Sequence, residues 1–87
     1  MATYIDVRVA CAEVDKGDLL VGNNAEWAKE IINRTPKADV VPREVIEEIF
    51  EDIENLIEKY YNDRYYTVAD MECDVHDLEK KYRRRNK

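Results

Sequence analysis

The sequence has no serine and no glutamine, and its 87 residues include only two glycines, two cysteines and one histidine. Without serine, the chain cannot use the serine nucleophile of many hydrolases. Two glycines are too few for a glycine-rich loop that holds phosphates. Two cysteines do not make a dense disulfide framework, and we find neither an apolar signal stretch nor a run long enough to span a bilayer. We therefore expect a protein of the reducing cytoplasm.

The nucleophile candidates are Cys11, Cys73 and three threonines, and His76 lies close to Cys73 in the sequence. Cys73 and His76 are three positions apart and would share one face of a helix. That spacing suits a Cys–His nucleophile pair, or two zinc ligands with Cys11 as a third. Structural zinc sites usually have a second closely spaced ligand pair, which this sequence lacks. We predict no catalytic residues, no metal and no cofactor, so an enzyme is not expected; metal binding by Cys73 and His76 is the alternative.

Residues 42–61 have the pattern of one long amphipathic helix, which would be about 28 Å long. At about 100° per residue, its apolar side chains fall within an arc of about 140° that contains no acidic residue. The apolar side consists of Val45, Ile46, Ile49, Phe50, Ile53, Leu56, Ile57 and Tyr60. The acidic residues on the other side are Glu44, Glu47, Glu48, Glu51, Asp52, Glu54 and Glu58. This helix is expected to anchor the core and to present a negatively charged surface.

Around this helix we predict a mainly α fold of three or four helices, with a short strand or two, in a single domain of residues 1–87. Asn24 is expected to cap a second helix over residues 25–34, which Thr35-Pro36 would end. Residues 18–24 are predicted to form a loop and residues 37–41 a connector. A homodimer is plausible, because a chain this short leaves apolar surface on a long amphipathic helix to cover.

The first segment, residues 4–15, fits two structures. Ile5, Val7 and Val9 alternate with more polar residues, as in a strand. A helix capped by Asp6 and ended near Gly17 also fits. We favour the helix, because alanine and glutamate are poor strand residues.

The last quarter of the chain also has two interpretations. In the favoured one, residues 64–68 are extended and Asp74 caps a final helix, with Asp77 in the reciprocal capping position. In the other, a single helix begins at Thr67, because apolar residues recur from there at 3-4-3-4 spacing. Those residues are Val68, Met71, Val75, Leu78 and Tyr82.

The net charge of −6 is unevenly distributed. The six bases of residues 80–87 leave eight bases against all 20 acids in residues 1–79, so the body carries −12 and the tail +6. The acidic body should repel nucleic acid. We expect the tail either to fray or to contact the acidic helix, of the same or of a second subunit.

The best candidate for a functional site is an acidic face of residues 42–61. Along this helix a row recurs about once per turn, near 5.4 Å apart: Glu44, Glu48, Glu51, Asn55 and Glu58. Such a row could imitate nucleic acid and bind a basic groove. The simpler interpretation is a solvated face that keeps the protein soluble. We name Glu44, Glu47, Glu48, Glu51, Glu54 and Glu58 the acidic face. The tyrosines at the end of this helix are expected mainly to pack in the core or at its rim. They could also form an interface, because tyrosine is enriched at binding hot spots, and Tyr61 and Tyr66 are the members that we select as exposed and partner-binding.

Four stretches look familiar when they are read together: residues 4–6 (YID), 18–28 (DLLVGNNAEWA), 35–43 (TPKADVVPR) and 77–82 (DLEKKY). They resemble small uncharacterised proteins encoded by phages and prophages of Firmicutes-type bacteria. The resemblance implies an accessory protein of a mobile element that acts in the cytoplasm of the bacterial host. It implies no assigned activity, but such proteins often bind host or phage proteins, and some block host defence.

These observations together predict a small acidic phage accessory protein that binds and inhibits a host protein through its acidic face. The partner would be a basic nucleic-acid-binding protein such as a defence nuclease, as for anti-CRISPR proteins. The protein itself would contact neither nucleic acid nor membrane. The alternative is a self-assembling structural or regulatory helical module without an inhibitory role.

Overall fold

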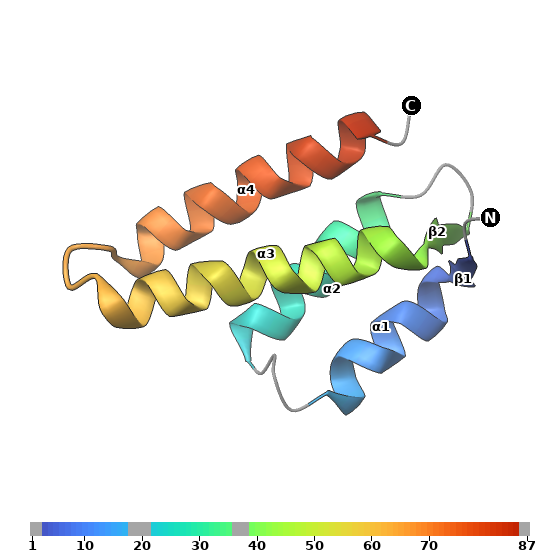
Figure 1. The fold of residues 1–87 in the computed structure, drawn as a ribbon, viewed down its shortest axis with the longest axis horizontal. Coiled ribbons are helices and arrows are strands. Elements are labelled where there is room, and N and C mark those ends of the chain that lie inside the picture. Colours follow the sequence, from blue (N-terminus) through green and yellow to red (C-terminus); the bar gives the residue numbers. More distant parts are fainter. Residues whose placement is uncertain (1–2, 18–21, 36–38, 86–87) are drawn as a thin grey trace.

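A computed structural model describes residues 3–17, 22–35 and 39–85 (Figure 1). The prediction of a mainly helical fold is confirmed, since the described residues form four helices and one two-stranded sheet. None of the described helices combines the length and apolarity that a membrane span requires. In chain order the elements are β1 (Tyr4–Asp6), α1 (Val7–Lys16), α2 (Asn23–Arg34), β2 (Val40–Pro42), α3 (Arg43–Asn62) and α4 (Val68–Arg85).

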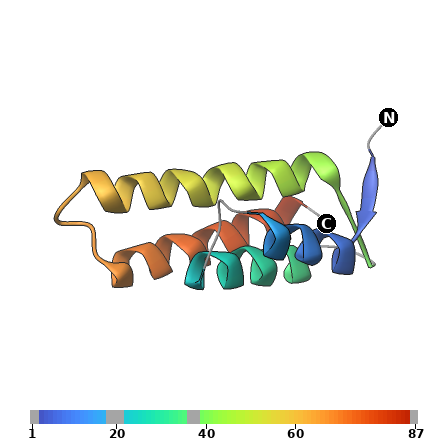
Figure 2. The same ribbon diagram turned by 90° about the horizontal axis from the view of Figure 1, so that it is seen from below.

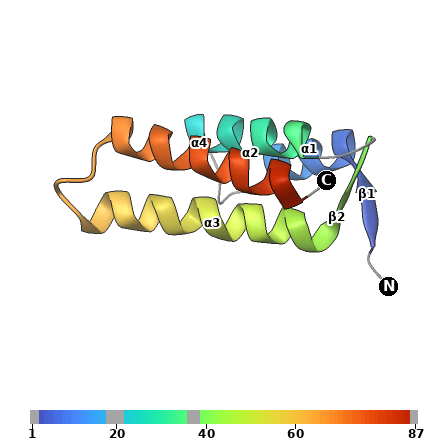
Figure 3. The ribbon, with the colours of Figure 1, turned by 90° about the horizontal axis from the view of Figure 1, so that it is seen from above.

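The helices form two layers, with α3 alone in one of them. Figures 2 and 3 show α3 lying across a second layer that contains α1, α2 and α4. In that second layer α2 lies between α1 and α4, and it packs against both. On the opposite side of α3, Glu44, Glu47, Glu51 and Glu58 are exposed.

The core lies between the two layers. Ile46, Ile49 and Ile53 of α3 are almost completely buried, as the apolar pattern of residues 42–61 predicts. They pack with Ile31 of α2 and Tyr82 of α4, among others. Phe50, Leu56 and Ile57 of the apolar arc are only partly buried, and Tyr60 is exposed. The cover of the arc therefore decreases toward the C-terminal end of α3.

Both expectations for the N-terminal segment hold in part. Residues 4–6 form β1, and α1 follows directly, with Asp6 as the N-cap and Gly17 as the C-cap. Asp6 Oδ1 accepts a hydrogen bond from Arg8 N at 2.7 Å, and this bond holds the pKa of Asp6 below its usual value. The side-chain cap explains why a strand can become a helix within one residue.

The partner of β1 is a strand that the sequence did not predict. β1 and β2 pair antiparallel with Tyr4 opposite Pro42 and Asp6 opposite Val40. Residues 40–41 are therefore part of a strand and not of a connector. Pro42 is the last residue of β2 and the N-cap of α3, so it precedes the helix instead of lying in its first turn.

The start of α2 differs from the prediction. The helix begins at Asn23, and its N-cap is Gly22, whose φ of 60° suits glycine because it has no Cβ. Asn24 is thus inside the helix, and its predicted capping role is wrong. Of the predicted loop, Asn23 and Asn24 belong to α2, and residues 18–21 lie outside the described part of the chain.

The final helix follows the interpretation that we did not favour. α4 runs without a break from Val68 to Arg85, so Asp74 and Asp77 are inside it and cap nothing, and no strand forms at residues 64–68. Thr67 and Asp70 make the capping box instead. Thr67 Oγ1 accepts from Asp70 N at 3.2 Å, and Asp70 Oδ2 accepts from Thr67 N at 3.1 Å. Residues 80–85 of the basic segment belong to this helix.

Candidate protein-binding surface

All six glutamates of the acidic face lie on α3, and the helical repeat places them on the side opposite the buried Ile46, Ile49 and Ile53. Four of them are exposed, and Glu48 and Glu54 are half-buried at the edges. Because α3 is a continuous 20-residue helix, the carboxylates are held in a nearly straight row. The four exposed members are Glu44, Glu47, Glu51 and Glu58.

The exposed members of this row lack ion pairs with the described part of the chain. Among the described residues, we find no ion pair for the four exposed members or for Glu54. Nearby bases are engaged elsewhere: Arg43 pairs with Glu13 of α1 at 3.4 Å, and Lys59 Nζ lies 4.5 Å from the centre of the Tyr66 ring. The face therefore carries several negative charges without cationic partners in the described part of the chain.

Asp52 is the acidic residue of α3 that does not belong to this face. Its carboxylate accepts a hydrogen bond from the buried Tyr82 hydroxyl, and Lys81 Nζ lies 3.2 Å from Asp52 Oδ2. Both partners come from the last third of α4. Asp52 thus joins the two helices, and one base of the C-terminal basic segment contacts α3.

The two tyrosines that we selected are in different environments. Tyr61 is 80% exposed near the end of α3, as expected. Tyr66 is only 8% exposed, so the expectation that it is a surface residue is wrong. The turn after α3 folds Tyr66 back onto α4, where its hydroxyl donates to Asp74. Burial raises the pKa of Tyr66, and the Asp74 carboxylate raises it further.

The residues considered for metal binding lie on two helices. Cys73 and His76 are exposed on α4, while Cys11 is half-buried on α1. Burial raises the pKa of the Cys11 thiol, which makes the thiolate form less accessible. Among the described residues, no group of three or more cysteine, histidine or acidic side chains could hold a metal ion.

Sequence reasoning missed a buried carboxylate on α4. Glu79 is 7% exposed and pairs with Arg34 of α2, with Arg83 at 3.5 Å and with His76 Nδ1 at 3.6 Å. The spacing of His76, Glu79 and Arg83 along one helix face was a visible signal, but the contact with Arg34 depends on the packing of α2. This cluster joins two helices and lies away from the acidic face.

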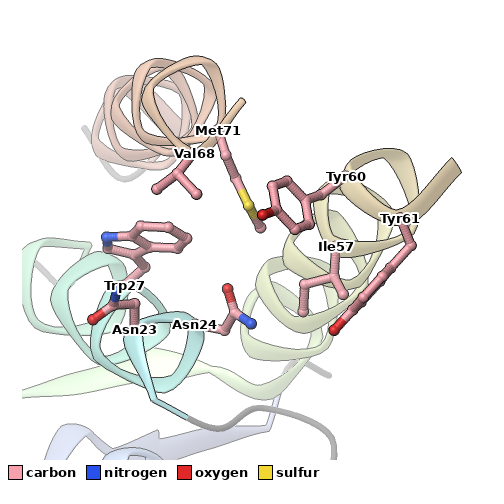
Figure 4. A pocket seen from close by; sticks show the side chains of 8 residues that line it. All are labelled: Asn23, Asn24, Trp27, Ile57, Tyr60, Tyr61, Val68 and Met71. Atoms are coloured by element: carbon pink, nitrogen blue, oxygen red, sulfur yellow. The ribbon is translucent and has the colours of Figure 1, made fainter. Parts of the chain in front are cut away.

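Sequence reasoning also missed a pocket where α2, α3 and α4 meet (Figure 4). Its volume is about 240 Å³. We call it the aromatic pocket, because Trp27 of α2 and Tyr60 and Tyr61 of α3 contribute three rings to its lining. The other lining residues are Asn23, Asn24, Ile57, Val68 and Met71. Tyr60 belongs to the apolar arc of α3 but is 40% exposed, because it borders this pocket instead of the core.

Comparisons of this chain with protein-family models, with curated proteins and with solved structures found no significant match.

Proposed function

We propose that this protein is a non-enzymatic binding protein whose acidic face occupies the basic groove of a nucleic-acid-binding protein. The observation that carries the proposal is the row of exposed glutamates on α3 that has no ion pairs with other described residues. The helix that carries the row, α3, forms one layer of the two-layer domain by itself (Figure 3). Glu44, Glu47 and Glu51 follow one another at about one turn, roughly 5.4 Å, and Glu58 lies two turns after Glu51. The one-turn spacing is of the same order as the spacing of phosphates along a nucleic-acid strand.

Electrostatics supports a cationic partner. A one-sided row of negative charge steers a basic surface toward it and accelerates association, and salt weakens both effects. The row also has a cost, since glutamates four positions apart on a helix repel one another. A face that served only solubility would not need its charges in one line on one helix.

The resemblance to phage and prophage proteins suggests where such binding would act. In the cytoplasm of a bacterial host, a protein that fills the nucleic-acid groove of a defence nuclease inhibits it without any chemistry of its own. Neither a catalytic residue nor a cofactor is needed for this mechanism.

The test is capture of partners from bacterial lysate by the tagged protein at low and high salt, with mass spectrometry to identify them. We expect a basic nucleic-acid-binding protein that is captured at low salt and is released by added nucleic acid. Capture that is insensitive to both salt and nucleic acid would contradict the proposal.

A pair of matched variants then locates the surface. The double variant Glu47→Lys and Glu51→Lys reverses two charges of the acidic face. The double variant Glu72→Lys and Asp77→Lys makes the same change of net charge on the exposed side of α4. Affinity for the captured protein should fall about tenfold or more in the α3 variant and change little in the α4 variant. Equal losses in both variants would mean that net charge, and not this face, determines binding.

A second candidate function, self-assembly, is favoured by exposed apolar side chains at the turn between α3 and α4. Tyr61 and Tyr65 are each about 80% exposed there, and Val68 is also exposed. Contacts of this kind would produce a homodimer whose stability depends little on salt. Analytical ultracentrifugation at two salt concentrations separates this candidate from the first, since it predicts dimers of the purified protein alone.

A further inference from the structure

The aromatic pocket has ring systems on facing walls. Figure 4 shows Trp27 on one side and Tyr60 on the other, with the side-chain amide of Asn24 between them. The rings of Tyr60 and Tyr61 have their centres 5.8 Å apart and are inclined at 74°. Aromatic faces carry partial negative charge, so a space bounded by several rings attracts a cation.

Tyrosines near this pocket already hold cations of the protein itself. Lys59 Nζ lies over the ring of Tyr66, and the guanidinium of Arg64 lies 5.7 Å from the centre of the Tyr65 ring. In the described part of the chain, no lysine or arginine lies over the three rings of the aromatic pocket, and none lines it. These three rings therefore remain available to a cation from outside.

The charges around the pocket also favour a cation. Glu54 and Glu58 lie on α3 next to Ile57 and Tyr61 in the helical repeat, so the end of the acidic face borders the pocket. The whole chain carries a net charge of −6. An anionic ligand would be repelled, and a neutral ligand would gain nothing from this field.

The lining decides which kind of cation fits. A primary ammonium has three N–H donors to satisfy, and the lining side chains offer it the neutral oxygens of two amides and two tyrosine hydroxyls but no carboxylate. Ile57, Val68 and Met71 make much of the remaining lining apolar. A methylated ammonium has apolar substituents and fewer or no N–H groups to leave unpaired. At about 240 Å³ the pocket is also smaller than the roughly 300–1,000 Å³ of sites for drug-sized ligands.

We propose that the aromatic pocket binds an alkylated ammonium group, with the rings of Trp27, Tyr60 and Tyr61 around the positive charge. This site goes beyond the proposed function and does not depend on it, because the acidic face can bind its partner whether or not the pocket is filled.

Trp27 is the only tryptophan of the chain, so its fluorescence reports directly on the pocket. We would titrate the protein with choline, and with 3,3-dimethylbutan-1-ol, the uncharged isostere in which carbon replaces the nitrogen. Sodium chloride at equal ionic strength serves as the control for salt. Choline should change the emission saturably and bind about tenfold more tightly than the alcohol. Equal binding of the two compounds, or no saturable change with choline, would overturn the proposal.

Two equally exposed tyrosines provide matched variants. Tyr61 lines the pocket and Tyr65 does not, although both are about 80% exposed, so neither substitution should disturb the fold. Tyr61→Leu should weaken choline binding about threefold to thirtyfold, whereas Tyr61→Phe should retain it because the ring remains. Tyr65→Leu should leave binding unchanged. If Tyr61→Leu and Tyr65→Leu bind choline with the same affinity, the rings of the pocket do not hold the cation.

A further titration separates two sources of the same chemical group. Trimethyl-lysine within a short uncharged peptide presents the group as a protein side chain, and choline presents it as a free small molecule. Tighter binding of the peptide would identify a modified protein as the ligand, and tighter binding of choline would identify a metabolite. Failure of both probes would reject the site and would leave the acidic-face proposal untouched.

Discussion

Replacing Glu51 by lysine should make the protein more stable. Glu51 is exposed on α3, one turn after Glu47, so their carboxylates repel each other. Removing this repulsion gains about 0.2–0.5 kcal/mol, and the new attraction between Glu47 and the lysine adds a similar amount. The gain from this pair, about 0.4–1 kcal/mol, raises the melting temperature by roughly 2–8 °C for a domain of this size. Glu48 and Glu54, three positions from Glu51, act in the same direction.

The variant Glu72→Lys is the control for net charge. Glu72 is an exposed helical glutamate like Glu51, but its neighbours three and four positions away are all non-acidic: Val68, Ala69, Val75 and His76. Its replacement should change the free energy of unfolding by only a few tenths of a kcal/mol. Both variants change the total charge equally, so a difference between them reports on the local row.

Urea unfolding followed by far-UV circular dichroism measures these differences. At low salt Glu51→Lys should unfold at a higher urea concentration than Glu72→Lys. High salt should reduce the difference between the two urea midpoints, because it screens the repulsion. If the two variants have the same midpoint at low salt, the glutamates of α3 do not repel one another measurably, and the argument that the row is costly fails. A variant that is more stable yet binds the partner less well would indicate that the row serves binding at the expense of stability.

Two further substitutions test how α4 is held, each by urea unfolding. Thr67→Ala removes the capping box with Asp70 and should cost about 1 kcal/mol; an unchanged midpoint would mean that α4 does not need this cap. Tyr82→Phe keeps the buried ring but removes the hydroxyl that donates to Asp52, so it should cost about 1.5 kcal/mol. This loss is at the low end of the range for a hydrogen bond to a charged group, because Lys81 still pairs with Asp52. An unchanged urea midpoint would show that the hydroxyl contributes nothing to the contact between α3 and α4.

The features of α3 could be predicted because they are local. Its apolar and acidic residues follow a single 3.6-residue repeat over five turns, so burial of Ile46, Ile49 and Ile53 could be inferred without any knowledge of what packs on them. The placement of the acidic face on one exposed side follows from the same repeat. For α1, the cap at Asp6 and the end at Gly17 were equally readable.

The start of α4 could not be decided locally. Asp74 with Asp77, and Thr67 with Asp70, both have the spacing of a capping box. The choice depends on whether the apolar residues before Asp74 are buried. Met71 is 5% exposed in the fold, and Tyr66 packs against the same helix, so one long helix buries more apolar surface than a short one.

Other features depend on contacts between distant parts of the chain. β2 is only three residues long, too short for an alternating pattern, and it exists because β1 supplies its hydrogen-bonding partner. The aromatic pocket takes residues from three helices, so no single stretch of sequence contains its signal. Glu79 reads as a surface charge until α2 brings Arg34 to it.

The pairing of β1 with β2 has a consequence for the order in which this protein folds. Tyr4 pairs with Pro42, so β1 has no partner until residue 42 has left the ribosome, a delay of roughly 2–8 s at normal rates of synthesis. Helices and short loops form in microseconds or less, so α1 and α2 can associate long before then. The strand pair therefore forms late during synthesis. It fixes α1 only when the beginning of α3 has been made, which is also when the core between the two layers can start to form.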